Sequence, residues 1–432
     1  MQEICTAEPA NRTDDLTAAL LSIAAAYPTP LYVYDLDAVR QRIDALRNVL
    51  GGRFEISYAV KANPNRALLK AIAPRVNNFD ASSYKEVERV SEVAADKTIT
   101  FTGPGKRDDE LLRFARRGGG ELVLESVEEA ESLSKAIAAH GLGRQPVIVR
   151  VNPARSPRHF GASMSSKRSQ FGIDEDQIES VLRAITALPG LQLIGFHSYT
   201  ATNSLNAEAI GENVRIMIDL FRRCVELCGI DPELLIFGAG FGLPYFENEK
   251  ELDIDAVAAA VVPMADELRS EARFRKTRLV FELGRWLVGP AGYLLTSVIR
   301  TKTSRGTAIR ICDAGFNAHM AACGMLGGLF KRNWRIRNLS NPNGTPETCD
   351  LVGPLCTSID QVATGIVLPQ VRTGDVLMIE YSGAYGLTAS PTRFISHPEP
   401  KEIAILDGQI RDVTESSLNW WSSPTESVRP TS

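Results

Sequence analysis

The chain has 432 residues, of which 44% are hydrophobic and 23% charged, and its formal net charge is −4. This composition is that of a folded globular protein and excludes a disordered, collagen-like or low-complexity chain. The slightly acidic balance excludes a nucleic-acid-binding surface spread over the whole chain, so an acidic ligand must be held by local groups. At this length we expect about two or three domains, or fewer if one of them is a large α/β barrel.

The sequence also predicts the compartment. No apolar run approaches the roughly 20 residues that a membrane helix needs, and the first residues lack the positive start of a signal peptide. The seven cysteines are odd in number and mostly isolated, which is typical of free thiols in a reducing compartment. We therefore expect a cytoplasmic protein. Cys224 and Cys228 lie close in sequence, but no second Cys or His pair of metal-ligand spacing accompanies them, so we expect no metal site.

Eight short runs rich in β-branched and aromatic residues alternate with helical segments between residues 54 and 285. The predicted strands are Phe54–Val60, Val76–Phe79, Thr98–Phe101, Glu121–Leu124, Val147–Val151, Leu193–His197, Leu234–Phe237 and Arg278–Phe281. Ser83 with Glu86, and Ser126 with Glu129, form capping boxes that begin two of the intervening helices. Eight such units over about 230 residues predict a (β/α)8 barrel, and the alternative that periodicity leaves open is a doubly wound open sheet.

After Arg285 the pattern changes to predicted strands with sparse helical signal, at Tyr293–Lys302, Thr307–Cys312 and Val376–Tyr381. Ser304-Arg305-Gly306 predicts a hairpin turn. The α/β fold is therefore expected to combine the barrel with a mainly antiparallel C-terminal β domain. The expected divisions are an N-terminal segment (1–30) associated with the β domain, the barrel (31–285), the β domain (286–415) and a flexible tail (416–432).

Polar residues follow nearly every predicted strand of the barrel. Because the active site of such a barrel lies where the C-terminal ends of its strands meet, we expect these residues to face one pocket. They are Lys61, Asp80, Gly103–Lys106, Glu125, Arg150, His197 with Tyr199, Gly238–Gly242, and Glu282 with Arg285.

Three of these positions suggest a chemistry. Lys61 follows an apolar strand, and it is either a solvated surface charge or a partly desolvated amine; desolvation would lower its pKa and make it nucleophilic, as in a Schiff-base lysine. Gly238-Ala-Gly240-Phe-Gly242 is either a plain turn or a loop whose backbone N–H groups approach a phosphate. Glu282 would be costly to bury without a partner, and that partner is either a cationic ring nitrogen or Arg285.

An amine, a phosphate-binding loop and an acid together suit pyridoxal 5′-phosphate (PLP). Its aldehyde needs an amine, its phosphate needs N–H donors and an arginine, and its pyridine nitrogen needs a partner. A carboxylate partner such as Glu282 keeps that nitrogen protonated, which favours loss of CO2 from Cα. An arginine partner would suit racemisation instead.

The same residues resemble the fold-type III PLP enzymes, the family of diaminopimelate and ornithine decarboxylases and of alanine racemase. The resemblance runs from about Leu31 to Glu402 and rests on the order of its motifs. These motifs are Tyr58-Ala-Val-Lys61-Ala-Asn, Asp80-Ala-Ser-Ser-Tyr-Lys-Glu86, Gly103-Pro-Gly-Lys106, Arg150-Val-Asn-Pro153, Phe171-Gly-Ile, Gly238-Ala-Gly-Phe-Gly-Leu-Pro-Tyr245, Glu282-Leu-Gly-Arg285, Gly353-Pro-Leu-Cys356 and Gly383-Ala-Tyr385.

The resemblance implies a role for each matching residue. Lys61 and Cys356 would be catalytic: the lysine would bind the cofactor covalently, and the cysteine would come from the other subunit of a homodimer to reprotonate Cα. Asp80 and Glu86 would support the lysine. The remaining cofactor-binding residues would be Arg150 beneath the ring, His197, Tyr199 and Thr202 beside it, Gly238, Gly240, Arg285 and Tyr385 at the phosphate, and Glu282 at the pyridinium.

The chain also departs from the family pattern. Tyr199 stands where the family usually has a histidine stacked on the cofactor, Thr202 replaces a serine, and Leu283 replaces a proline. Thr357 stands where an acid normally binds the distal ammonium of a diamino acid, which disfavours such substrates, although Asp360 is a possible replacement.

These departures resemble decarboxylases of siderophore and antibiotic pathways that act on modified or carrier-linked amino acids. His319, Thr357 and Asp360 are then the expected substrate-binding residues. The basic stretch 331–337 would either bind additional substrate carboxylates or form a solvated charged loop. The alternatives are a diaminopimelate, ornithine or lysine decarboxylase, a racemase on the same fold, and a non-catalytic PLP carrier. A metal-dependent barrel hydrolase is disfavoured because the first strand lacks a His-x-His pair.

Overall fold

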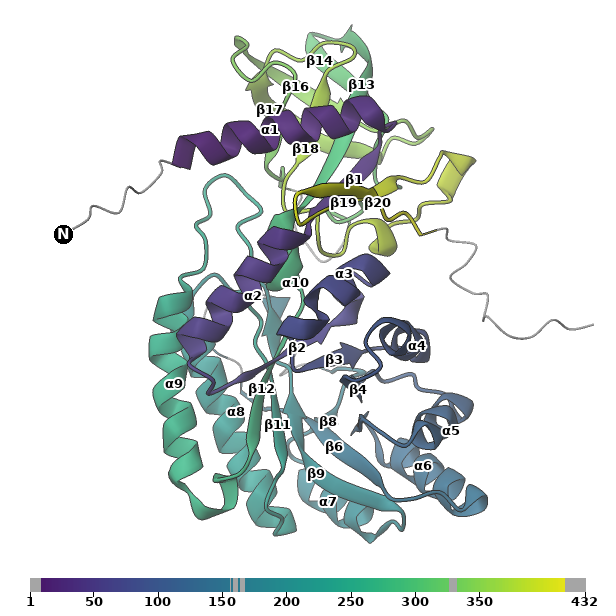
Figure 1. The fold of residues 1–432 in the computed structure, drawn as a ribbon, viewed down its shortest axis with the longest axis vertical. Helices are drawn as coiled ribbons and strands as arrows, with labels where there is room; N and C mark the ends of the chain where they lie inside the picture. The colour runs from purple at the N-terminus through teal and green to yellow at the C-terminus, as the bar shows by residue number, and fades with distance from the viewer. Residues whose placement is uncertain (1–8, 156, 158–161, 164–167, 326–331, 416–432) are drawn as a thin grey trace, which may run out of the picture.

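The computed structural model describes residues 9–155, 157, 162–163, 168–325 and 332–415. Figure 1 shows a barrel surrounded by helices and, at one end of it, a second unit built mainly of strands. The expected tail, 416–432, lies outside the described residues. Within the described ranges, no helix is long and apolar enough to cross a membrane.

The barrel is a closed ring of parallel strands. Its strands are β2 (Glu55–Ala59), β3 (Asn78–Ala81), β4 (Thr98–Phe101), β5 (Glu121–Leu124), β6 (Gln145–Asn152), β9 (Leu191–Ser198), β11 (Leu234–Gly238) and β12 (Arg278–Leu283). Pairing runs from β5 through β4, β3, β2, β12, β11 and β9 to β6, and β6 pairs with β5 again. This closure confirms the predicted barrel and excludes the open sheet. Every predicted strand overlaps an observed one.

Helices cover the outside of this ring (Figure 1). They are α2 (Leu36–Leu50), α3 (Arg66–Ile72), α4 (Tyr84–Val93), α5 (Asp108–Arg117), α6 (Val127–His140), α7 (Ile178–Ala187), α8 (Ala207–Cys228) and α9 (Ile254–Ser270). The two predicted helix starts are confirmed, because the hydroxyls of Ser83 and Ser126 accept hydrogen bonds from the backbone N–H groups of Glu86 and Glu129.

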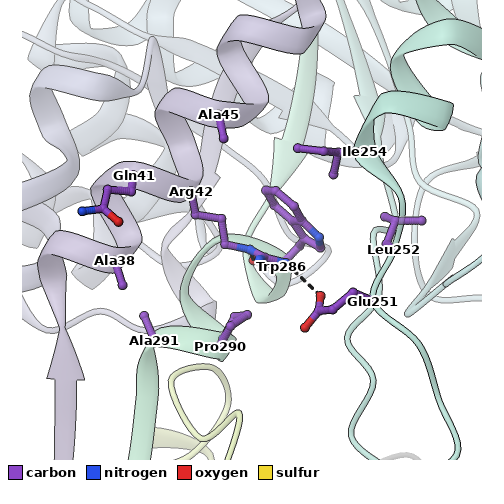
Figure 2. Close-up of a pocket in the computed structure, with 10 residues that line it drawn as sticks. All are labelled: Ala38, Gln41, Arg42, Ala45, Glu251, Leu252, Ile254, Trp286, Pro290 and Ala291. Atoms are coloured by element: carbon purple, nitrogen blue, oxygen red, sulfur yellow. Dashed lines mark hydrogen bonds and ion pairs between the residues drawn. The ribbon is translucent and has the colours of Figure 1, made fainter. Parts of the chain in front are cut away.

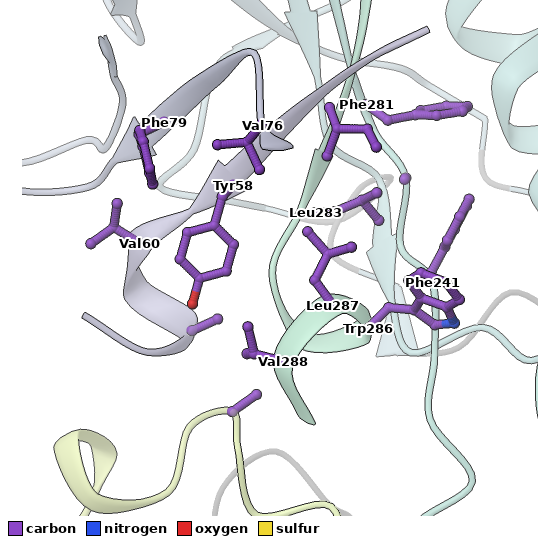
Figure 3. Close-up of a cluster of buried hydrophobic side chains, with 14 of the residues drawn as sticks. Tyr58, Val60, Val76, Phe79, Phe241, Phe281, Leu283, Trp286, Leu287 and Val288 are labelled. Atoms are coloured by element: carbon purple, nitrogen blue, oxygen red, sulfur yellow. The ribbon is translucent and has the colours of Figure 1, made fainter. Parts of the chain in front are cut away.

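Short elements complete this part of the chain. They are η1 (Val60–Ala62), η2 (Ala73–Arg75), β7 (Ala162–Ser163), β8 (Ile173–Asp174), β10 (Ala201–Thr202), η3 (Ala272–Phe274), α10 (Arg285–Val288) and η4 (Gly289–Ala291). Figure 3 shows the apolar cluster that packs η1 and α10 against the strands. In it, the rings of Phe54 and Phe281 stack with centroids 4.0 Å apart, and the hydroxyl of Tyr58 donates to the carbonyl of Asn63. The cluster thereby fixes the segments that follow β2 and β12.

The second unit is a mixed sheet. Its strands are β1 (Leu31–Asp35), β13 (Gly292–Ser304), β14 (Thr307–Cys312), β15 (Ile336–Asn338), β16 (Pro346–Val352), β17 (Gln361–Pro369), β18 (Val376–Ile379), β19 (Lys401–Leu406) and β20 (Gln409–Asp412), with η5 (Leu387–Ala389) and η6 (Phe394–Ser396). Most pairs are antiparallel as expected, but β1–β19 and β14–β16 are parallel. The predicted hairpin joins β13 to β14 through Arg305 and Gly306, which both have positive φ.

The pairing of β1 corrects one expected boundary. The division at residue 31 assigned this strand to the barrel, but β1 lies between β13 and β19 in the second sheet. Helix α1 (Pro9–Ala26) also packs on this sheet, through Leu20 and Ile23. The described part of the chain therefore starts in the β unit and enters the barrel only at α2.

Candidate active site

A pocket of about 410 Å³ lies at the C-terminal ends of the barrel strands. Most of the predicted cofactor residues line it: Lys61, Arg150, His197, Tyr199, Thr202, Glu282, Arg285 and Tyr385. A narrower recess beside it adds Gly240. Residues at or after the ends of β2, β6, β9 and β12 therefore line one pocket, as expected, and the β unit adds Tyr385.

Lys61 lies in η1, where its side chain, 42% exposed, faces the pocket. Its Nζ donates to Oε1 of Glu282 at 3.3 Å and lies 3.9 Å from Oδ2 of Asp80. Burial lowers the pKa of Lys61, but the negative charges of Glu282 and Asp80 outweigh burial, and the pKa is raised. The expected lowering is therefore wrong for the chain alone: the amine is protonated and must give up a proton before it can attack a carbonyl.

Asp80 is suited to take that proton. Burial, and then the charge of Glu282, raise the pKa of its carboxyl group. Its Oδ1 accepts a hydrogen bond from the Thr102 hydroxyl at 2.8 Å, whereas the buried Oδ2 has no hydrogen-bond partner. The free oxygen is the one nearest Lys61.

Glu282 lies near the end of β12 and is held by two groups from other elements. Besides Lys61, His197 Nε2 donates to its Oε2 at 3.1 Å. Burial raises the pKa of Glu282, but Lys61 and then His197 outweigh burial, and the pKa lies well below its usual range. Burial lowers the pKa of His197, which is therefore a neutral donor to an ionised carboxylate. Arg285, the alternative partner, instead donates to the Tyr245 hydroxyl at 2.8 Å.

The recess around Gly240 and Arg285 has the features of an anion site. The guanidinium of Arg285 lies 4.6 Å from the Tyr385 ring, and its buried Nε has no partner among the described residues. Gly240 has a φ of 65°, a conformation that glycine adopts without strain. Thr202 also lines this recess. The unpartnered Nε of Arg285 beside this glycine fits the binding of a phosphate group.

Gly238 has a different position from the one expected. It lines neither pocket, and a Cβ atom at this residue would lie 2.2 Å from Cδ2 of Tyr199. The absence of a side chain therefore makes room for the Tyr199 ring. Tyr199 itself lines both pockets, and its ring centroid is 5.9 Å from Nζ of Lys61.

The loop that follows Lys61 is anchored to the β unit. The backbone N–H of Tyr385 donates to the carbonyl of Ala62 at 2.8 Å, and Nδ2 of Asn63 donates to the carbonyl of Gly383 at 3.1 Å. A little further on, Glu415 accepts hydrogen bonds from the backbone and the guanidinium of Arg66. The position of the lysine therefore depends on both parts of the chain.

The expected catalytic cysteine and the expected substrate residues lie outside these pockets. Cys356 is exposed, and neither it nor Thr357 lines the two pockets. Asp360 is buried, and its two oxygens accept the backbone N–H groups of Phe316 and Leu355, both at 2.8 Å. A substrate-binding role for Asp360 is therefore wrong for this conformation, because its carboxylate is already used to shape the loop.

His319 is also corrected by the structure. It is buried, its Nδ1 accepts the backbone N–H of Ala322, and burial lowers its pKa to about 3. A neutral imidazole away from the pocket supplies no positive charge to a substrate carboxylate.

The basic stretch is largely neutralised. Arg332 pairs with Glu249 at 3.1 Å, Arg335 donates to the carbonyls of Phe246 and Glu249, and Arg337 pairs with Glu380. Residue 331 lies outside the described part of the chain. These contacts favour the charged-loop interpretation.

A second pocket, of about 450 Å³, lies on the outside of the barrel between α2 and the segment before α9 (Figure 2). The guanidinium of Arg42 stacks 3.7 Å from the Trp286 ring and lies 3.6 Å from the carboxylate of Glu251. Its charged groups thus pair with each other and its remaining lining is mostly apolar, so it lacks the reactive groups of the barrel mouth.

Sequence reasoning missed several residues of the site. Thr102, Phe171 and Ser82 line the main pocket, and Tyr245 holds Arg285. Phe171 and Tyr245 stand inside motifs that carried the resemblance, and that position was their only signal. In the ranges that the structure covers, no group of three or more His, Cys, Asp or Glu side chains is arranged to hold a metal ion.

Comparison with known proteins agrees with this geometry. The family model described as pyridoxal-dependent decarboxylase, pyridoxal binding domain, matches residues 36–289. The L-glutamyl-[BtrI acyl-carrier protein] decarboxylase of Niallia circulans is 31% identical, over 90% of this chain and 92% of that protein. A diaminopimelate decarboxylase of Methanothermobacter thermautotrophicus is 32% identical, over 92% and 91%.

Two further similarities extend the comparison. The 2-[(L-alanin-3-ylcarbamoyl)methyl]-2-hydroxybutanedioate decarboxylase of Staphylococcus aureus is 27% identical over 88% of this chain and 95% of that protein. The crystal structure of diaminopimelate decarboxylase from M. jannaschii with L-lysine superposes with a TM-score of 0.83 at 23% identity, over 92% and 91% of the two chains. The latter supports the barrel and β-domain fold.

The fold and the lysine–carboxylate pocket define a PLP-dependent enzyme, and the chain belongs to the pyridoxal-dependent decarboxylases. It is a PLP-dependent carboxy-lyase that acts on an amino acid or an amino-acid derivative. The resemblance found in the sequence is confirmed at the level of the family. The racemase and carrier alternatives find no support among these relatives.

Proposed function

We propose that this decarboxylase acts on a modified or carrier-linked amino acid in siderophore or other specialised biosynthesis. Its similarity to decarboxylases named for a carrier-linked glutamyl group and for a hydroxybutanedioate conjugate of alanine supports this choice. The diaminopimelate decarboxylases are similar to the same degree and supply the second candidate.

The observation that carries the proposal is the absence of an available acid beside Cys356. In the segment 353–360 the only acidic residue is Asp360, and its carboxylate oxygens accept two backbone N–H groups. Thr357 offers a neutral hydroxyl where the family pattern has an acid. A buried ammonium without a counter-charge is strongly disfavoured, so this loop does not suit the distal end of a free diamino acid.

The pocket residues have the following proposed tasks. PLP, when bound, supplies an electrophilic aldehyde and a ring that takes up the electrons left on Cα when CO2 departs. Lys61 would provide the amine, Asp80 would accept its excess proton, and Glu282 would hold a proton on the ring nitrogen while His197 keeps that carboxylate in place. Arg285, with Gly240, Thr202 and Tyr385, would bind the phosphate, and Tyr199 and Arg150, which line the same pocket, would contact the ring.

Reprotonation of Cα requires a residue from outside this pocket or Lys61 itself. We propose that Cys356 reaches the site from a second subunit, because it is exposed and does not line the pocket of its own chain. Ile359, three residues further on, is 56% exposed, as expected for an apolar contact between subunits. The enzyme is then a homodimer whose active sites each use both chains.

The test of the substrate proposal is CO2 release from a matched panel. The panel contains meso-diaminopimelate, L-lysine, L-ornithine, the glutamyl thioester of phosphopantetheine, and a citryl conjugate of diaminopropionate. We expect kcat/KM for one conjugate to exceed that for every free diamino acid by about 100-fold or more, as pocket discrimination allows. A preference for meso-diaminopimelate would establish the second candidate.

Thr357→Glu tests the loop directly. Restoring an acid should raise kcat/KM for free diamino acids by about 10-fold, because a carboxylate then faces the distal ammonium. Thr357→Gln has the same length without the charge and should give no gain. Equal behaviour of the two variants would place selectivity in another part of the site.

A further inference from the structure

Glu125 follows β5 and has a buried carboxylate that joins three parts of the pocket wall. Its side chain is only 3% exposed. Oε1 accepts the backbone N–H of Gly103 at 2.9 Å, and Oε2 accepts that of Gly172 at 2.8 Å. Nη1 of Arg150 lies 3.3 Å and 3.5 Å from the same two oxygens. No other carboxylate of the described residues makes so many contacts to the pocket wall.

The two loops bound by Glu125 form part of the pocket wall. Gly103 is adjacent to Pro104 and Gly172 is adjacent to Phe171, and both neighbours line the pocket. Gly172 has a φ of 63°, and a Cβ atom there would lie 3.0 Å from Cγ of Arg150. The Phe171 ring lies 4.6 Å from the guanidinium of Arg150. One carboxylate therefore sets the spacing between two loops and an arginine.

The same carboxylate balances the charge of Arg150. The Arg150 side chain is 8% exposed, and Glu125 is its only ion-pair partner in the part of the chain that the structure describes. Negative and positive groups alternate around the pocket. Negative Glu125 pairs with positive Arg150, and beyond the neutral ring of His197, negative Glu282 pairs with positive Lys61. The positive charge of Arg150 contributes to lowering the pKa of both Glu282 and His197.

We propose that Glu125 is a positioning residue for decarboxylation, which orders the substrate-side loops and limits the positive field that Arg150 exerts on the lysine–carboxylate centre. The role does not depend on which amino-acid derivative is the substrate. The role of Glu125 depends only on the PLP-binding pocket at the C-terminal ends of the barrel strands. It can therefore be tested separately from the proposed substrate.

The test uses the PLP-bound enzyme with Glu125→Gln, which keeps the size of the side chain and removes its charge. The more positive field disfavours the protonated nitrogen of Lys61. The midpoint of the pH titration of the visible cofactor absorbance should therefore fall by on the order of one pH unit. With any substrate that is turned over, kcat should fall by about 10-fold or more.

Two further variants separate positioning from stability. Glu121→Gln is the matched control, because Glu121 is also a buried acid, 8% exposed, on the same strand β5, and it pairs with Arg278 rather than with a group at the pocket. It should leave the absorbance midpoint unchanged even if it lowers the melting temperature. Glu125→Asp keeps the charge, so the absorbance midpoint should return to the wild-type value. Its shorter side chain binds the two loops less well, so KM should rise.

An unchanged midpoint in folded Glu125→Gln, with only a lower melting temperature, would reduce Glu125 to a structural residue and overturn the proposal. If Glu125→Gln does not fold, the double variant Glu125→Gln with Arg150→Gln removes both charges. The proposal expects the double variant to fold and to titrate near the wild-type midpoint. A double variant that is also unfolded would contradict the charge argument.

Discussion

The two ends of the proposed active site are built in opposite ways. At the Lys61 end, Lys61 from η1, Asp80 from β3, neutral His197 from β9 and Glu282 from β12 form one set of ion pairs and hydrogen bonds, in which every side chain except that of Lys61 is buried. At the Cys356 end, the cysteine is exposed, its neighbour Thr357 is neutral, and the nearby Asp360 is turned toward backbone amides. The difference separates the chemistry shared by the family from the selection of the substrate.

This separation has a physical basis. Removing one member of a buried charged set leaves its partner uncompensated, which costs about 3–5 kcal/mol, so such a set tolerates little change. Exposed neutral residues away from such sets usually change stability by only about 0.5 kcal/mol when substituted. In the proposed shared site, a loop such as 353–360 is therefore the part in which specificity could vary without loss of the fold.

The largest effect should come from the buried end. Lys61→Ala removes the amine that binds the cofactor, so the visible absorbance of the covalently bound cofactor should disappear and CO2 release should fall by about 1000-fold or more. Lys61→Arg keeps the positive charge beside Glu282 and should be equally inactive. Lys85→Ala, which removes a half-buried ion pair with Glu88 outside the pocket, should resemble the wild type. A wild-type spectrum for Lys61→Ala would remove the assignment.

An intermediate effect is expected at the exposed end. Cys356→Ala removes the proposed proton donor and should slow decarboxylation by about 100-fold or divert it toward transamination. Mixed with Lys61→Ala, it should regain about a quarter of wild-type activity, because half of the dimers would contain one intact shared site. Cys228→Ser, on α8, should behave as the wild type. Failure of the mixture to regain activity would contradict shared sites.

The smallest effect on activity should come from His319, which lies at neither end. Since burial lowers its pKa to about 3, the unfolded chain binds a proton that the folded chain does not as the pH falls below about 6.5. This residue therefore favours folding fully above pH 6.5, and its contribution is lost progressively as the pH falls toward 3. At pH 5 the loss is about 2 kcal/mol.

His319→Asn checks this prediction. The Asn oxygen replaces the Nδ1 acceptor for the Ala322 N–H, and the variant has no group that titrates in this range. In urea unfolding at pH 7.5 and pH 5, the variant should lose about 2 kcal/mol less stability than the wild type between the two pH values, with kcat/KM nearly unchanged. A large change in KM would instead support the substrate role that the sequence predicted.

Much of the barrel could be predicted because its signals are local. Each strand is a short apolar run, helix starts carry capping side chains, and barrel geometry then brings the strand ends together. This argument correctly grouped Lys61, Arg150, His197 and Glu282. It gave the wrong sign for the pKa shift of Lys61, because it weighed burial alone and left out the charges of Glu282 and Asp80, which other strands bring next to the amine.

The errors share that cause. Strand β1 joins the second sheet by pairing with β13 and β19, which lie hundreds of residues further along the chain. Asp360 is withdrawn from a substrate role because its carboxylate packs against Gly315 and Gly353, where a Cβ atom would collide with it. Neither fact has a signature within the segment itself. Pairing partners and burial of single polar side chains require the folded chain.

The seam between Ala62 and Tyr385, and between Asn63 and Gly383, has a consequence for engineering. The segment matched by the pyridoxal-binding family model ends at residue 289, before the partners of this seam. A barrel cut off at that boundary would keep Lys61 but lose the hydrogen bonds from residues 383 and 385 that hold the loop after the lysine in position. Chimaeras among related decarboxylases should therefore exchange the lysine loop and the 383–385 turn together.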